Sequence, residues 1–103
     1  MTVEEIYPLA VEFRRHFHQY PEFAMQEVET QRYITGVWDK YKIPYQVVGT
    51  GIIAILGKGQ KCVAIRADMD ALKVKEETGL AYSSCNEGMM HACGHDMHMA
   101  MVL

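Results

Sequence analysis

The N-terminal part of the chain has apolar residues at the spacing of an amphipathic helix. Thr2 is followed three residues later by Glu5, a capping-box pattern that predicts the start of the helix. Pro8 falls close to that start, where a proline is tolerated, and Pro21 ends the segment. The expected helix would have an inward face formed by Val3, Ile6, Leu9, Ala10, Phe13 and Phe17.

A second helical period begins at Glu27 and ends before Pro44. Acidic residues near its start and Lys40 and Lys42 near its end agree with the helix macrodipole. At the other end of the chain, the methionine, alanine and valine content of residues 95–103 predicts the beginning of a third helix.

Three short apolar runs predict β-strands at residues 45–48, 52–56 and 61–66. Glycine-containing turns separate the runs, and the second and third are expected to pair as a hairpin. The second and third runs contain the continuously apolar stretches IIAIL and CVAI. Such stretches are typical of strands covered on both faces of a sheet. The fold class is therefore expected to be α/β. Residues 80–83 are a weaker strand candidate.

Length and composition fit one small soluble domain over residues 1–103. The net charge is -3 and the ten Lys and Arg residues are spread along the chain, so nucleic-acid binding is not expected. No apolar run approaches the ~20 residues that span a bilayer, and no secretory signal is evident. A cytoplasmic location without membrane association is therefore expected. The cysteine count is odd and Cys62 lies in an apolar run that suits a buried thiol, which favours reduced thiols over disulfides.

The stretch GMMHACGHDMHMAMVL contains His91, Cys93, His95 and His98. Imidazole and thiolate are the ligands that borderline-soft divalent metals prefer. Residues two apart do not share a helix face, so Cys93 and His95 can both bind only if Gly94 lets the backbone turn where the helix begins. The spacing matches no standard zinc finger, so metal binding and ordinary hydrogen bonding both remain open.

A second feature, RADMDAL, places Asp68 and Asp70 directly after the apolar run at 61–66. Ligands in open α/β sheets bind at the ends of strands, so these carboxylates are candidates to bind a metal or to orient its ligands. The alternative is a turn with solvated acids. In RRHFHQYPEF, by contrast, the position of His16, His18 and Glu22 near a helix end favours capping and packing roles.

These segments together resemble the zinc-peptidase-like amidohydrolase family that includes aminoacylases, hippurate hydrolases and indole-acetyl-amino-acid hydrolases. RRHFHQYPEF followed by ETQRYI, then VAIRADMDAL with EET, and finally GMMHACGHDMHMAMVL look like the successive N-terminal motifs of that family, in order. The resemblance covers essentially all of this chain and a minor, N-terminal part of a family member. It implies a partial three-layer sandwich belonging to the catalytic domain, with the dimerisation domain outside these residues.

The resemblance also implies a metal site. Cys93 and His95 match the family's ligands to a pair of divalent metals, usually zinc, manganese, cobalt or nickel, while His91 and His98 would flank them. Asp70 matches a supporting acid near the metals, with Asp68 beside it. Lys73 departs from the family pattern, which commonly has a proline there.

The activity implied by this family is hydrolysis of the amide bond of N-acyl amino acids or similar small molecules by a metal-activated water. In the family pattern the general-base glutamate and the remaining ligands lie beyond Leu103, so this chain alone is expected to be catalytically incomplete. Open apolar surface and self-association are also expected, because a doubly covered sheet needs more elements than these residues provide.

Two alternatives remain. One is a non-catalytic truncated module that binds metal or another molecule. The other is a small structural metal protein with a closed site made of Cys85, Cys93, His95 and His98.

Overall fold

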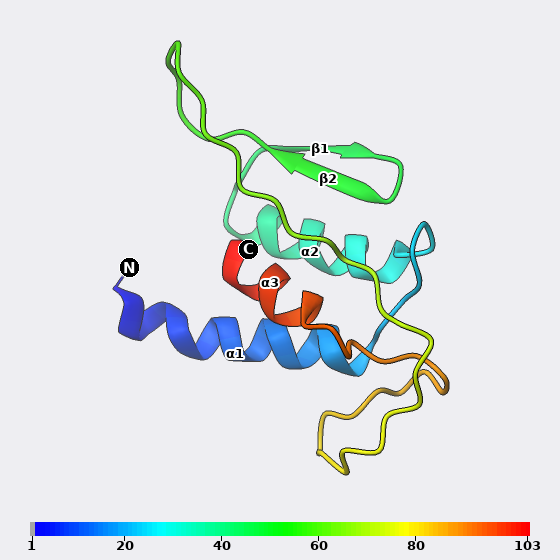
Figure 1. The fold of residues 1–103 in the computed structure, drawn as a ribbon. Helices are drawn as coiled ribbons and strands as arrows, with labels where there is room; N and C mark the ends of the chain where they lie inside the picture. The colour runs from blue at the N-terminus through cyan, green and yellow to red at the C-terminus, as the bar shows by residue number, and fades with distance from the viewer. Residues whose placement is uncertain (1) are drawn as a thin grey trace.

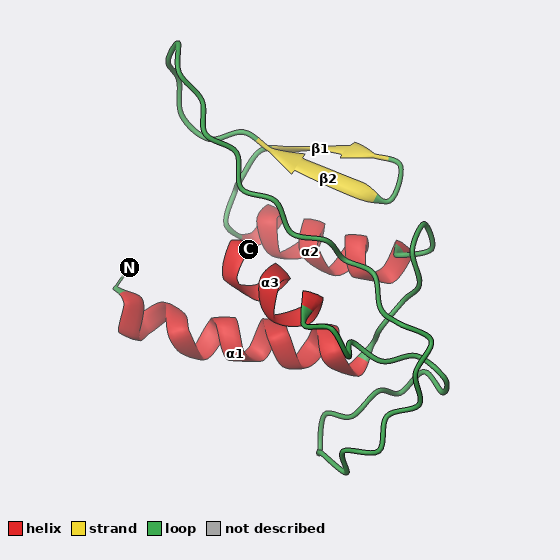
Figure 2. Cartoon of the chain, viewed as in Figure 1, coloured by secondary structure: helices red, strands yellow, loops and turns green. Residues whose placement is uncertain are grey.

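The computed structural model describes residues 2–103 and contains three helices and one β-hairpin (Figures 1 and 2). The helices are α1 (Val3–Gln19), α2 (Val28–Lys40) and α3 (His95–Val102), and the strands are β1 (Tyr45–Val48) and β2 (Gly51–Ala54). Between β2 and α3 the chain runs as a long connection with almost no regular structure (Figure 2). None of the helices in the described part is long and apolar enough to cross a membrane.

Helix α1 has the predicted capping box. The Thr2 hydroxyl accepts a hydrogen bond from the Glu5 backbone N–H at 3.2 Å, and the Glu5 carboxylate accepts one from the Thr2 N–H, also at 3.2 Å. Pro8 lies inside the helix, where it is tolerated. The first predicted helix is therefore confirmed.

Helix α2 is also confirmed, and its N-terminus is capped from outside the helix. The side chain at its N-cap position, Glu27, makes no capping hydrogen bond. Instead the Glu22 carboxylate accepts hydrogen bonds from the Thr30 N–H at 2.6 Å, the Thr30 hydroxyl at 2.7 Å and the Glu29 N–H at 3.2 Å. A negative charge here satisfies free helix N–H groups and complements the helix dipole.

The predicted hairpin between residues 52–56 and 61–66 is wrong. Strand β1 pairs with β2 in antiparallel register, Tyr45 opposite Ala54 and Val48 opposite Gly51. The two-residue loop Gly49–Thr50 joins them, and Gly49 has a φ of 61°, a conformation that glycine adopts without steric cost. The short glycine-containing turn thus pairs β2 with β1, which precedes it, and not with residues 61–66.

Residues 61–66 form no strand in the part of the chain that the structure describes, nor do residues 80–83, which make a turn closed by the Ser83 N–H and the Leu80 carbonyl. Val63 is 91% exposed and Ile65 77% exposed, so the covering that this apolar run predicts is not provided within residues 2–103. Cys62, expected to be buried, is exposed, and all three cysteines are free.

The core lies where the three helices meet. Phe17 of α1, Ile34 of α2 and Met99 of α3 are its buried centre, and Ile52 of β2 packs against it. In Figure 1, α3 lies between α1 and α2, while the hairpin lies beyond α2. Only these three helices and one hairpin form here, so the described residues contain part of an α/β arrangement and not three complete layers. Helix α3, predicted from 95–103, is confirmed.

Candidate metal centre

His95 and Asp70, which the sequence singled out separately, are brought together by the fold. His95 is the first residue of α3, and its Nδ1 lies 2.9 Å from the Asp70 backbone carbonyl and 3.2 Å from the Asp70 Oδ1. A hydrogen bond at one ring nitrogen fixes the orientation of an imidazole and the tautomer that it adopts. With Nδ1 engaged in this way, Nε2 is the nitrogen of His95 that could bind a cation.

Cys93 precedes this helix at a turn made by Gly94. Gly94 is the N-cap residue of α3 and has a φ of 120°, a conformation that L-residues rarely adopt. Its carbonyl accepts hydrogen bonds from the Met97 and His98 N–H groups, each at 3.1 Å, which starts the helix. The backbone turn expected between Cys93 and His95 is therefore present, and the Cys93 thiol is exposed.

Asp68 lies near this region but contacts a different partner. Its carboxylate oxygen is 2.8 Å from an Arg66 guanidinium nitrogen. The hydrogen bond from Arg66 and the charge of that guanidinium lower the pKa of Asp68, and the nearby His95 and His98 add to the effect. The Asp68 carboxylate is thus exposed and paired with arginine.

His91 and His98, which flank the two candidate ligands, differ in their exposure to solvent. His91 is only 4% exposed, and burial lowers its pKa to about 4, so the ring is neutral at ordinary pH. Neither of its ring nitrogens has a hydrogen-bond partner among residues 2–103. His98 is exposed, and its ring centroid lies 6.1 Å from that of His95.

Within residues 2–103, no three His, Cys, Asp or Glu side chains are arranged to hold a metal ion. The closed four-ligand site of a small structural metal protein is therefore not formed. An exposed thiol beside a histidine oriented by the Asp70 backbone carbonyl is a donor set that suits a borderline-soft divalent cation. The residues present thus fit one part of a metal site.

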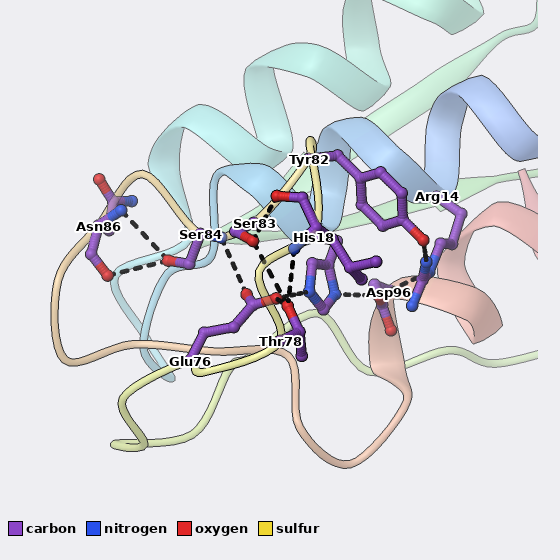
Figure 3. A network of polar contacts seen from close by, with 10 residues as sticks. Arg14, His18, Glu76, Thr78, Tyr82, Ser83, Ser84, Asn86 and Asp96 are labelled. Atoms are coloured by element: carbon purple, nitrogen blue, oxygen red, sulfur yellow. Dashed lines mark hydrogen bonds and ion pairs between the residues drawn. The ribbon is translucent and has the colours of Figure 1, made fainter.

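A buried polar network beneath this region was not predicted from the sequence (Figure 3). It joins Arg14 and His18 of α1, Glu76 of the long connection and Asp96 of α3. Arg14 and His18 are four residues apart and so share one face of α1, which was the signal available in the sequence. Nothing local indicated that Glu76 and Asp96 would meet that face.

The structural interpretation of the RRHFHQYPEF segment is confirmed for His16 and Glu22. The His16 ring stacks on Tyr33 with centroids 3.6 Å apart, and burial lowers the pKa of His16. Glu22 caps α2 as described above, and its backbone carbonyl accepts a hydrogen bond from the Ala71 N–H at 2.8 Å. This last bond ties the helix end to the residue that follows Asp70.

Sequence comparisons agree with this placement of the motifs. Residues 64–103, which include the four predicted site residues, match the peptidase family M20/M25/M40. An uncharacterized hydrolase of Staphylococcus epidermidis is 45% identical over 92 residues, which cover 87% of this chain and 24% of that protein. An N-acetyldiaminopimelate deacetylase of Streptococcus uberis is 46% identical over 101 residues, which cover 90% of this chain and 27% of that enzyme.

A solved structure is similar over nearly the whole chain. It is the YXEP protein of Bacillus subtilis, a dinuclear metal-binding peptidase from the M20 family. The TM-score is 0.87 at 40% sequence identity, and the match covers 94% of this chain and 29% of that one. The chain thus spans between about a quarter and three tenths of the length of these relatives. Fold, motifs and sequence identity agree, and the chain corresponds to the N-terminal part of M20 family peptidases.

Proposed function

We propose that this chain is the N-terminal part of the catalytic domain of a metal-dependent amidohydrolase, with Cys93 and His95 as two ligands of a dinuclear metal centre. The observation that supports this proposal best is the His95 ring, held through Nδ1 by Asp70 at the start of α3, directly after the exposed Cys93. The similar YXEP protein binds a dinuclear metal, which agrees with this assignment.

The substrates we propose are N-acyl amino acids or related small amides. Several relatives are N-acetyldiaminopimelate deacetylases, which supports an N-acyl substrate for the family branch. The reaction adds water across the amide: the carbonyl carbon gains oxygen, the C–N bond breaks, and a carboxylate and an amine are released.

The metal pair, when bound, would polarise the substrate carbonyl and lower the pKa of a bound water. It would be zinc, manganese, cobalt or nickel. Within this chain Cys93 and His95 would bind it, and Asp70 would keep the His95 ring oriented through Nδ1. Asp68 is proposed to act nearby as a supporting negative charge, because it is exposed and lies two residues from Asp70, which contacts His95.

We further propose that the three-layer sandwich is completed by sequence outside these 103 residues, as is the general base. The dimerisation domain would also lie there. The exposed apolar side chains of residues 61–66 support this, because continuously apolar strands are normally covered on both faces. The 103-residue chain by itself is therefore expected to hydrolyse no N-acetyl or N-benzoyl amino acid.

The metal ligands can be tested with Co²⁺, whose absorption reports thiolate and imidazole coordination. The wild-type chain is expected to develop a thiolate-to-cobalt band on titration. Cys93→Ser should abolish that band, and His95→Gln should weaken Co²⁺ binding by about tenfold or more.

His98→Gln is the matched control, since His98 lies on the same helix and is exposed. It should leave the titration unchanged. A thiolate band that survives in Cys93→Ser, or an equal loss of binding in His98→Gln, would contradict the proposed ligand set.

A further inference from the structure

The buried network under α3 contains an imidazole between two carboxylates. His18 Nδ1 lies 2.8 Å from Asp96 Oδ2, and His18 Nε2 lies 2.9 Å from Glu76 Oε2 (Figure 3). The side chains of His18, Asp96 and Glu76 are 3%, 0% and 4% exposed. These three groups come from α1, α3 and the long connection, so the ring joins three separate parts of the chain.

The charges in this network are balanced only if the ring is an imidazolium. A neutral imidazole has a single N–H and can donate to one carboxylate, whereas both ring nitrogens of His18 lie at hydrogen-bond distance from a carboxylate oxygen. Arg14 Nε lies 3.0 Å from the same Asp96 oxygen. Two cations thus face two carboxylates, which removes the large cost of burying an unpaired charge.

Tyr82 and Glu76 both lie against the His18 ring. Tyr82 lies edge-on to it, with centroids 5.7 Å apart, and the Tyr82 hydroxyl accepts a hydrogen bond from Arg14 at 3.0 Å. Burial acts to raise the pKa of Glu76, but hydrogen bonds from Thr78, His18 and the Ser84 N–H outweigh it and lower that pKa to about 2. Glu76 is therefore ionised at neutral pH.

The network reaches the candidate metal ligands through the backbone of α3. Asp96 directly follows His95, and its second oxygen accepts a hydrogen bond from the Met97 N–H at 2.9 Å. The carboxylate is thus bonded to the first turn of α3 on one side and to α1 on the other. Asp70 orients the His95 ring, whereas Asp96 holds the backbone that carries Cys93 and His95.

We propose that His18 is a positioning residue: as an imidazolium between Asp96 and Glu76, it fixes the start of α3 so that Cys93 and His95 are preorganised for metal. This inference rests on the proposed function for its metal-binding part. The interaction with Asp96 is the part that reaches the ligands, and the interaction with Glu76 holds the loop of residues 76–84 against α1.

Two substitutions separate these interactions. His18→Asn keeps an amide donor near the position of Nδ1, toward Asp96, while His18→Gln keeps one near the position of Nε2, toward Glu76. His18→Gln should weaken Co²⁺ binding about tenfold, the usual size of an outer-partner effect. His18→Asn should stay within about threefold of wild type, because it retains the contact on which the ligands depend.

His16→Gln is the control, since His16 lies on the same helix but stacks on Tyr33 away from the network. Helical circular dichroism should be equal for all these variants, so that binding is compared between folded chains. Equal Co²⁺ affinity in wild type, His18→Asn and His18→Gln would overturn the positioning role. So would a weaker affinity in His18→Asn than in His18→Gln.

Nuclear magnetic resonance of the metal-free chain decides the proposal independently of metal. Two proton-bearing ring nitrogens are expected for His18, and His18→Gln should shift the backbone amide signals of residues 93–97 more than His16→Gln does. If the wild-type chain binds no Co²⁺, the metal site of the proposed function fails, while these signals still support or refute the anchoring of α3. A single protonated nitrogen, or unchanged amide signals, would refute it.

Discussion

The helices and the connection after β2 bury their apolar residues very differently. In the helical part, Phe17 is 1% exposed and Met99 3% exposed, whereas in the connection after β2 Val63 is 91% exposed and Ile65 77% exposed. Each helix forms its own backbone hydrogen bonds, so a short chain can build helices and pack their apolar faces. An apolar strand needs neighbours at its edges and on its faces, which residues 61–66 lack within the described chain.

The largest effect expected from this comparison is in the helical core. Phe17→Ala should lower the free energy of unfolding by about 3–5 kcal/mol, because it leaves a cavity between α1, α2 and α3. Val63→Ala should change it by less than about 0.5 kcal/mol, as expected for an exposed side chain. Denaturant unfolding followed by circular dichroism measures both. Similar losses for the two variants would show that the connection is as well packed as the core.

A second contrast is between buried and exposed ion pairs. Asp96→Asn should cost about 2–3 kcal/mol of unfolding free energy, because it leaves Arg14 and His18 without their shared buried carboxylate. Asp68→Asn removes only the exposed contact with Arg66 and should have a much smaller effect. The same denaturation measurement compares them, and an equal cost for both would contradict the burial argument.

Glu76 is expected to make stability depend on acid pH. Its pKa falls from 4.5 to about 2 on folding, so the unfolded chain binds the proton more readily between these values. Stability contributed by Glu76 is therefore present above pH 4.5 and is lost as the pH falls toward 2. Glu76→Gln should flatten this dependence and cost about 2–3 kcal/mol at neutral pH, because it removes one of the two carboxylates that balance the buried cations.

The control for this pH series is Glu87→Gln, because Glu87 is exposed. Its unfolding free energy should follow the wild-type pH dependence. A Glu76→Gln curve that is as steep as wild type between pH 4.5 and 2 would contradict the assignment.

The smallest effect on stability is expected for the exposed apolar connection. The double variant Val63→Lys with Ile65→Lys should leave the free energy of unfolding within about 0.5 kcal/mol of wild type. It should nevertheless reduce self-association, which we expect of the wild-type chain because these side chains offer open apolar surface. Sedimentation velocity at several concentrations measures this, and a strictly monomeric wild type would contradict the expectation.

Local patterns in the sequence predicted the three helices well. The capping box at Thr2, the helical periods and the apolar content near the C-terminus each depend on residues within a few positions of one another. Strand pairing was predicted wrongly: β2 pairs with β1 across the Gly49–Thr50 turn, and residues 61–66 form no strand within the described chain. Apolar runs identify potential strands but do not say which partners are present.

For the candidate site, the sequence alone determined its motif: Cys93, Gly94 and His95 at a helix start, and two aspartates after an apolar run. Their roles as metal ligands and supporting acids stay predictions. Only the tertiary structure decided that Asp70 meets His95 while Asp68 pairs with Arg66. It also placed His18 between Asp96 and Glu76, residues 78 and 58 positions away in the sequence. Such contacts depend on how helices and connections pack, and side-chain type and spacing do not encode that packing locally.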